Sequence, residues 1–285
     1  MKLASVVVLY NPDDRILGNI KSYIDYVDVV YAIDNSSVDN SAELKSDKIV
    51  YISNGGNMGI AYALNVGAKC AIEDGYEWLL TMDQDSAFHD DGVEKMKEFL
   101  LKCQHDPESQ YPYDKIGLIT PFHRTLFNGE EKLEQIDSPA VVMTSGNFIN
   151  LNAYQKIGGF KDWMFIDAVD FDYCLNLRDH GYDIWRLPQV ELKHNLGDVV
   201  FKNFGKKHMY SLNHSAMRRY YIVRNRYYFY DMYHERWPDF CNAERRRTHR
   251  EAAKIFLCEK QKFKKLFAML RGYIDYKMGV KGRKG

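Results

Sequence analysis

The first hundred residues alternate short apolar runs with segments of helical periodicity, and this alternation most constrains the fold. The apolar runs cover residues 3–9, 29–33, 49–53 and 78–82, and apolar residues recur at helical spacing over residues 16–27 and 60–72. Strands separated by helices form parallel β-α-β units with right-handed crossovers. The sequence therefore predicts an α/β fold with a mixed, mainly parallel sheet and flanking helices.

The pattern becomes less regular after residue 86. We expect a helix over residues 92–101, strands over residues 116–120, 140–149 and 182–188, and a helix that begins near Asp170. Beyond His194 the sequence becomes helix-forming, aromatic and basic. We therefore predict an α/β domain over residues 1–210 and a helical extension over residues 211–285 that packs on it.

Composition indicates an ordinary globular chain and names no partner. Of the 285 residues, 46% are hydrophobic and 27% are charged, and 39 basic residues balance 39 acidic ones. The five cysteines are scattered without a CxxC pair, which argues against a disulfide framework or a zinc cluster and suits a reducing compartment. No apolar run is long enough to span a membrane. From the cysteines we expect a cytoplasmic protein, with peripheral contact at the inner face of the cell membrane as an open alternative.

Polar clusters follow each of the first four predicted strands. They read YN, DNSS, NGGNMG and DQD in chain order. The carboxyl ends of parallel strands lie along one edge of a sheet, and open α/β sheets bind ligands at that edge. The sequence therefore predicts a binding site where these clusters converge.

Asp83 and Asp85 stand one residue apart at the end of the fourth strand. Aspartate is common in turns after strands, so both could be solvated turn residues. Carboxylate oxygens are also the ligands that hard divalent cations prefer. The position of the pair beside three other polar strand ends favours a metal and phosphate site.

Two further strand ends carry candidate nucleotide contacts. Gly59 opens a predicted helix directly after the third strand, so backbone N–H groups there could face an anion, although Gly56 and Gly59 could equally make a simple turn. The spacing matches neither the dinucleotide fingerprint nor the P-loop. Asp34 could accept a hydrogen bond from a base or a ribose hydroxyl, although a helix cap is the commoner explanation.

Later acidic residues and one histidine are candidates for catalysis. Asp167, Asp170 and Asp172 precede or open a predicted helix, and three carboxylates are more than capping requires. One of them, held near a metal, could remove a proton from an attacking hydroxyl. His194 could supply a further ligand to an octahedral Mn²⁺ or Mg²⁺ site, although a lone histidine is more often a surface or core residue.

The last third of the chain is rich in arginine, tyrosine and lysine. Residues 214–230 interleave arginines with tyrosines at helical spacing, which suits a diphosphate, lipid headgroups, nucleic-acid bases or a structural helix. No nucleic-acid motif accompanies them, so nucleic acid ranks last. Residues 263–274 predict an amphipathic helix that contacts either a membrane or a second subunit in a homodimer.

Taken in order, these motifs resemble the family 2 glycosyltransferases of the GT-A fold, and among them the bacterial rhamnosyltransferase-like branch. Each motif is weak alone, but the ordered set is specific for the family. The matching segments are VVVLYNPD (6–13), IDNSS (33–37), NGGNMGIAYALNVG (54–67), MDQDS (82–86), SGNFIN (145–150), IGGFKDWMFIDAVDFDYCLNLRDHGY (157–182) and KHNLGD (193–198).

The resemblance implies an inverting, metal-dependent transfer of a sugar from a nucleotide-sugar donor to a hydroxyl group. It favours dTDP-L-rhamnose as the donor, and a growing, lipid-linked cell-surface polysaccharide at the inner face of the membrane as the acceptor. Galactofuranosyl, glucosyl and galactosyl transferases of the family share every motif above, so these donors stay open.

The resemblance also implies roles for individual residues. Asp170 matches the catalytic base, but Val169 replaces the acidic residue that the family carries before it, which leaves the role of Asp167 open. Asp85 and His194 match the ligands of a divalent metal, Mn²⁺ or Mg²⁺, with Asp83 nearer the ribose and the metal-bound waters. The donor is expected to contact Tyr10, Asn11, Asp34, Asn57 and Gly59 through its base and ribose, and Arg218, Arg219 and Arg224 are candidates for its diphosphate or that of a lipid-linked acceptor.

Two other classes of protein are compatible with parts of the sequence. A sugar nucleotidyltransferase uses a similar sheet and acidic metal ligands, but it would carry a glycine-rich loop with Arg and Lys after the first strand, where this chain has YNPDD. A non-catalytic module at a membrane surface would explain the basic tail but not the acidic groups at the sheet edge.

Overall fold

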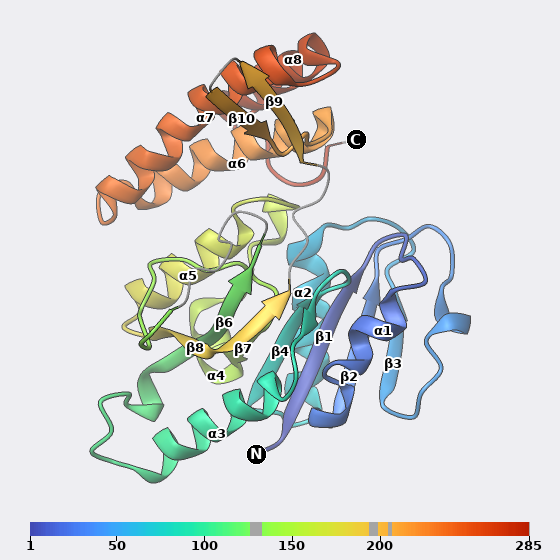
Figure 1. The fold of residues 1–285 in the computed structure, drawn as a ribbon, viewed down its shortest axis with the longest axis vertical. Helices are drawn as coiled ribbons and strands as arrows, with labels where there is room; N and C mark the ends of the chain where they lie inside the picture. The colour runs from blue at the N-terminus through green and yellow to red at the C-terminus, as the bar shows by residue number, and fades with distance from the viewer. Residues whose placement is uncertain (126–132, 194–198, 205–206, 285) are drawn as a thin grey trace. The chain divides into compact units, whose positions relative to one another are not determined.

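The computed structural model describes residues 1–125, 133–193, 199–204 and 207–284. By its internal contacts the chain divides into two compact units (Figure 1). Unit 1 comprises Met1–Asp162 and Tyr173–Asn195, and unit 2 comprises Trp163–Asp172 and Leu196–Gly285. Unit 2 thus includes Trp163–Asp172, which the sequence predicted to lie in the α/β domain.

Unit 1 is built on a mixed sheet, which among the described residues has eight strands in the order β3-β2-β1-β4-β7-β6-β8-β5. The neighbouring pairs among β1, β2, β3 and β4 are parallel, whereas β7 is antiparallel to both of its neighbours. The strands are β1 (Leu3–Leu9), β2 (Val29–Asp34), β3 (Ile49–Ser53), β4 (Trp78–Asp83), β5 (Ala87–Phe88), β6 (Ile116–Arg124), β7 (Asn147–Asn150) and β8 (Asp183–Lys193).

Helices cover both faces of this sheet. Val7 of β1 shares a core with Ile20 of α1 and Met96 of α3, while the neighbouring Val6 lies against Gly67 of α2. Because successive side chains of a strand point to opposite faces, α2 covers the face opposite to α1 and α3. The helices are α1 (Ile16–Lys21), α2 (Ile60–Glu73), α3 (Gly92–His105), α4 (Leu151–Ile157) and α5 (Val169–Asp179), with short 3₁₀ turns at Ile24–Tyr26, Ser41–Glu43, Tyr113–Lys115 and Asp162–Met164.

Unit 2 combines a hairpin with three longer helices. The antiparallel strands β9 (Val200–Phe204) and β10 (Lys207–Ser211) precede α6 (Ala216–Tyr233), α7 (Pro238–Cys258) and α8 (Lys262–Lys277). Val223 of α6 packs against Ile255 of α7 and Met269 of α8, so α6 is buried between the other two helices. The first four residues of α5 belong to this unit.

Two expectations about secondary structure were wrong. The expected strand over residues 140–149 forms only at Asn147–Asn150, because the Thr144 carbonyl accepts from Thr81 Oγ1 at 2.6 Å and Val142 N donates to Cys174 Sγ instead of joining a strand ladder. The hairpin of β9 and β10 lies where we expected helix. Lys202 Nζ of this hairpin donates to the Leu257 carbonyl at the end of α7, a contact that local periodicity does not encode.

All five cysteines are free thiols, as expected. In the part of the chain that the structure describes, none of the helices has the length and apolar character needed to cross a bilayer.

Candidate active site

The carboxyl ends of the first four strands lie level at one edge of the unit 1 sheet. Leu9 of β1 pairs with Asp34 of β2, Asp34 pairs with Ser53 of β3, and Val8 of β1 pairs with Asp83 of β4. Since all four strands run in the same direction, the polar residues that follow them emerge together. The predicted convergence of the four clusters is therefore confirmed.

Asp34 is fully buried at this edge and is surrounded by hydrogen-bond donors. Its carboxylate accepts from Ser36 N, Asn40 Nδ2 and Tyr51 Oη, each at 2.7 Å. Burial alone would raise the pKa of Asp34, but these hydrogen bonds hold it below its ordinary value. The Asp34 carboxylate thus stays charged although it is buried, and the three groups that donate to it are all neutral.

The loop between β3 and α2 is held by Asn35. Its Nδ2 donates to the Gly59 carbonyl at 3.1 Å, and its Oδ1 accepts from Asn54 Nδ2 at 2.9 Å and from Met58 N at 3.3 Å. Gly59 has a φ of 93°, which favours glycine, and its N–H donates to Asn57 Oδ1 at 3.0 Å. Sequence reasoning did not single out this role of Asn35, although the residue directly follows Asp34.

The ends of β1, β2 and β4 are joined by side-chain to backbone hydrogen bonds. Tyr10 N donates to Gln84 Oε1 at 2.8 Å, and Gln84 Nε2 donates back to the Tyr10 carbonyl at 3.2 Å. Asn11, with a φ of 46°, donates its N–H to Ser36 Oγ at 2.7 Å. These contacts fix the backbone of both residues, while the Tyr10 side chain remains half exposed.

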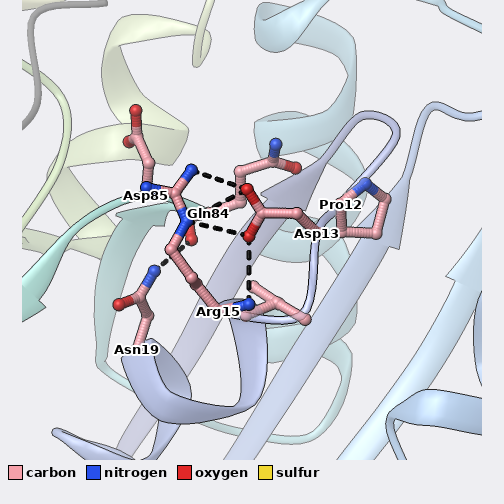
Figure 2. Close-up of a pocket in the computed structure, with 7 residues that line it drawn as sticks. Pro12, Asp13, Arg15, Asn19, Gln84 and Asp85 are labelled. Carbon is pink, nitrogen blue, oxygen red and sulfur yellow. Dashed lines mark hydrogen bonds and ion pairs between the residues drawn. The ribbon is translucent and has the colours of Figure 1, made fainter.

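A small open pocket lies beside this junction, and Figure 2 shows the residues that line it. Arg15 contacts Asp13 through Nη2 at 2.6 Å and Nε at 3.0 Å (Figure 2). The hydrogen bond to Asp13 is the main cause that raises the pKa of Arg15. The charge of Asp85 makes a smaller contribution in the same direction. Arg15 is a candidate contact that sequence reasoning missed, although it stands in the loop after β1. The lining residues are Pro12, Asp13, Arg15, Ile16, Asn19, Gln84 and Asp85.

Asp83 is held at the end of β4 by the segment that precedes β7. Ser145 Oγ accepts from Asp83 N at 3.0 Å, and the Ser145 carbonyl lies 2.6 Å from His123 Nε2. Asp83 and Asp85 are both partly exposed. The structure therefore places both carboxylates at the sheet edge, as the sequence predicted.

Asp83 and Asp85 could hold a divalent metal only together with further ligands. Over residues 1–125, 133–193, 199–204 and 207–284, no group of three or more His, Cys, Asp or Glu side chains could hold a metal. Two neighbouring aspartates fit a hard cation that takes its other ligands from phosphate or water oxygens. His194, the expected further ligand, lies outside the described residues.

The three later aspartates differ in their surroundings within unit 2. Asp170 is partly exposed in the first turn of α5, and its Oδ1 accepts from Phe171 N at 3.0 Å. Asp172 is fully buried and accepts from Tyr233 Oη at 2.9 Å. Burial raises the pKa of Asp167, and its ion pair with Arg218 at 3.2 Å opposes that rise. Asp170 is thus more accessible to a substrate than Asp172.

The three candidate arginines also differ. Arg218 is 44% exposed, whereas Arg219 and Arg224 are buried. Arg219 pairs with Glu259 at 2.7 Å, and the guanidinium of Arg224 donates to backbone carbonyls. The burial of Arg219 and Arg224 does not fit the expectation that they bind a diphosphate, because protein acceptors already occupy their guanidinium groups.

Comparison with known proteins places this chain in a family. Residues 5–151, just over half of the chain, match the family described as Glycosyl transferase family 2. The chain is 28% identical over 242 residues to the dTDP-rhamnosyl transferase RfbF of Shigella flexneri. The alignment covers 78% of this chain and 77% of that protein.

Solved glycosyltransferase structures share the fold at low sequence identity. S. aureus TarS (residues 1–349) aligns over 98% of this chain and 72% of its own, with a TM-score of 0.55 and 11% identity. GalNAc-T7, solved with UDP, GalNAc and Mn²⁺, aligns over 68% of this chain with a TM-score of 0.54 and 12% identity, and the chain spans only 43% of that structure.

The sheet edge, the family match and the shared fold agree with the resemblance found in the sequence. The chain belongs to the family 2 glycosyltransferases: it has the GT-A fold, resembles the rhamnosyltransferases of the family, and is an enzyme that uses a nucleotide-sugar donor.

Proposed function

We propose that this enzyme transfers L-rhamnose from dTDP-L-rhamnose to a hydroxyl of a growing, lipid-linked cell-surface polysaccharide. The similarity to a dTDP-rhamnosyl transferase over most of both chains supports the donor. The observation that carries the catalytic proposal is the level edge of β1, β2, β3 and β4, which gathers Asp34, Asp83 and Asp85 at the carboxyl ends of these strands. Other donors used by the family are the alternatives.

Each polar residue of the edge takes one part of the donor in this proposal. The base and ribose lie at Tyr10, Asn11, Asp34, Asn57 and Gly59, where Asp34 accepts from a hydroxyl or base N–H group in place of one of its three present donors. Asp83 lies on the ribose side, and Asp85 on the diphosphate side. Arg15 is our candidate for the donor diphosphate, and Arg218 for the diphosphate of a lipid-linked acceptor. Both guanidinium groups are exposed, so phosphate oxygens can replace their present partners Asp13 and Asp167.

Asp170 acts as the general base. Its carboxylate accepts the proton of the acceptor hydroxyl while the hydroxyl oxygen forms a bond to the anomeric carbon. The bond from that carbon to the diphosphate oxygen breaks, and the nucleoside diphosphate leaves with the bonding electrons. Because attack and departure occur on opposite faces, the anomeric configuration is inverted.

Asp85, with Asp83 and His194, would hold Mn²⁺ or Mg²⁺ together with the donor diphosphate. When bound, such a cation offsets the negative charge that develops on the leaving diphosphate. Carboxylate oxygens suit both metals, so the ligand chemistry does not select between them.

A donor screen tests this function. The purified protein is incubated with Mn²⁺ or Mg²⁺ and a panel of nucleotide sugars, with a glycosyl-diphosphate lipid as acceptor, and the release of nucleoside diphosphate is measured. We expect the fastest release from dTDP-L-rhamnose and a loss of release in excess EDTA. If nucleoside diphosphate is released only from another nucleotide sugar, that sugar replaces rhamnose in the proposal. Undiminished release in excess EDTA would contradict the dependence on a metal.

The exposed face of α8 supports contact with an anionic membrane surface. Its apolar side chains follow helical spacing: Phe263, Phe267 and Met278 are 73%, 68% and 71% exposed, with Leu270 and Ile274 between them. Exposed basic residues flank this face, and the only carboxylate within α8, Asp275, is buried. A basic amphipathic face of this kind binds anionic bilayers. The flanking residues are Lys260, Lys264, Arg271, Lys277, Lys281 and Arg283.

Sedimentation with lipid vesicles tests this contact. Replacing Phe263 and Phe267 with Ser should lower partition into phosphatidylglycerol vesicles by about tenfold or more, because each buried Phe contributes roughly 1.5–3 kcal/mol. The control Val38→Ser, at a 67% exposed site in unit 1, should not change it. Equal sedimentation of all three proteins would contradict the membrane contact. A loss of dimers by the double variant in the absence of lipid would also contradict it, and would indicate that this face is a subunit interface.

A further inference from the structure

The segment that leads into α5 has an unfavourable backbone conformation. Phe165, Asp167 and Ala168 have φ angles of 67°, 65° and 63°. In this left-handed region the side chain of an L-amino acid other than glycine crowds the backbone, so such residues occur singly and rarely. Three of them within four positions require surrounding contacts that hold the segment in place.

Asn225 of α6 makes such contacts. Its Nδ2 lies 2.7 Å from the Met164 carbonyl, 2.7 Å from the Ile166 carbonyl and 3.1 Å from the Asp167 carbonyl. The side chain is fully buried, so water does not compete for these acceptors. One amide group therefore binds three carbonyl oxygens of the left-handed segment.

Arg224 orients this amide and binds the beginning of the same segment. Its Nε donates to Asn225 Oδ1 at 3.0 Å, which fixes the amide so that Nδ2 faces the carbonyls. Its Nη2 donates to the Trp163 carbonyl at 3.0 Å, and its Nη1 to the Gly282 carbonyl at 2.6 Å. The guanidinium also lies 4.8 Å from the ring centre of Tyr221.

The helix that carries Arg224 and Asn225 is itself firmly held. Gly272 of α8 allows a close crossing with α6, because a Cβ at this position would lie 2.4 Å from the Tyr220 carbonyl. Tyr220 Oη donates to Asp275 Oδ2 at 2.8 Å across the same crossing. Asn225, which contacts the three carbonyl oxygens, therefore lies on a helix that α8 holds in place.

The left-handed segment over residues 165–168 determines where α5 begins, and therefore where Asp170 lies. The Ala168 carbonyl accepts from Asp172 N at 2.9 Å, so the first turn of α5 starts on the last left-handed residue. Asp170 lies inside that turn. A shift of Ala168 would therefore move the Asp170 carboxylate.

We propose that Asn225, oriented by Arg224, is a positioning residue for the base Asp170. This inference rests on the proposed function, in which Asp170 removes the acceptor proton. The C-terminal helices are then part of the catalytic apparatus, because they fix the direction of the base by binding the backbone that precedes it.

The test uses Asn225→Asp, which keeps the shape of the side chain but replaces the donating amide with an acceptor. The matched control is Val223→Ala, which removes apolar packing two residues earlier on the same helix and leaves the three carbonyl contacts intact. Transfer kinetics are measured with dTDP-L-rhamnose and a glycosyl-diphosphate lipid, and amide hydrogen exchange is followed over residues 163–172.

We expect Asn225→Asp to lower kcat by about 10²-fold, as a small misplacement of a reacting group does, with the donor KM unchanged. Exchange over residues 163–172 should rise in Asn225→Asp but not in Val223→Ala, which should keep its kcat despite a lower melting temperature. If Asn225→Asp does not fold, Asn225→Ser, with one short donor, replaces it and should show the same split. Ala168→Gly, which accepts the left-handed conformation without strain, should partly restore kcat in the Asn225 variant.

Unchanged exchange, or raised exchange with unchanged kcat, would overturn the positioning role. Equal loss of kcat in Val223→Ala would overturn it as well, since general destabilisation would then explain the effect. Failure of the proposed function looks different, because Asp170→Asn would then retain transfer whatever the Asn225 variants do.

Discussion

A buried carboxylate in each unit is held by a different kind of partner. In unit 1 the buried carboxylate of Asp34 is held by three neutral donors at a sheet edge where other polar groups emerge. In unit 2 the buried carboxylate of Glu259 is instead held by two cations, and it accepts from Arg219 at 2.7 Å and from Lys265 at 2.6 Å. A carboxylate held by neutral donors keeps its negative charge for a ligand, whereas mutual ion pairs stabilise a structure. The contrast supports ligand binding beside Asp34 in unit 1 and a structural role for the Glu259 ion pairs in unit 2.

The largest effect that would sharpen this contrast is expected at Asp34. Asp34→Asn removes the anion and places an amide N–H₂ against groups that already donate hydrogen bonds. We expect the donor KM to rise about 10- to 100-fold, because a charge-assisted hydrogen bond contributes about 1.5–3 kcal/mol. The measurement is steady-state kinetics with dTDP-L-rhamnose.

Asp74→Asn provides the matched control for Asp34. Asp74 accepts from the hydroxyl of the buried Tyr31 but lies at the end of α2, away from the four strand ends. We expect lower stability with an unchanged donor KM. An equal rise in KM for both variants would show that Asp34 acts through the stability of the sheet and not by contact with the donor.

A second effect concerns acid sensitivity and should separate the two units by the pH at which each loses stability. Burial, together with the charges of Arg218 and Arg219, lowers the pKa of His214 in unit 2 to about 3, from an ordinary value of 6.5. The unfolded chain therefore binds more protons, and this contribution to stability is lost as the pH falls below 6.5. Between pH 7 and pH 5 the loss should approach about 2 kcal/mol. The lowered pKa of Asp34 acts in the same direction in unit 1 but at lower pH, since its contribution to stability persists until the pH falls below the ordinary value of 3.8.

Urea unfolding at pH 7 and pH 5 measures this difference. His214→Gln should remove most of the acid-dependent loss from unit 2, while His249→Gln, at an exposed site on α7, should leave it unchanged. If His214→Gln shows the same pH dependence as the unsubstituted protein, the partly buried histidine is not its cause.

Much of unit 1 could be predicted from the sequence because its periodicity is strong. The strands Leu3–Leu9 and Ile49–Ser53 form with the predicted bounds, and the helix predicted over residues 60–72 ends one residue later, at Glu73. The site could be predicted as far as the strand ends, since parallel strands bring those ends to one edge. Arg15 was missed because its pairing with Asp13 beside Asp85 depends on the conformation of the loop.

Unit 2 was harder to predict because its contacts join distant parts of the chain. Arginines and tyrosines recur all around α6, and the packing of α7 and α8 on this helix decides which of them are buried. Spacing alone therefore did not distinguish the buried Arg224 from the exposed Arg218. The contact of Asn225 with the segment before α5 joins residues about sixty positions apart, and local sequence carries no signal of it.

The division of work between the units is tested most directly by comparing Asp170→Asn with Asp85→Asn. Binding of dTDP in the presence of Mn²⁺ is measured by calorimetry, and transfer is measured with dTDP-L-rhamnose and a glycosyl-diphosphate lipid. We predict that Asp170→Asn lowers transfer by about 10²–10⁴-fold and leaves dTDP binding intact, because only the base is lost. Asp85→Asn should weaken both. Retained transfer in Asp170→Asn, or equal loss of binding and transfer in that variant, would contradict its role as the base.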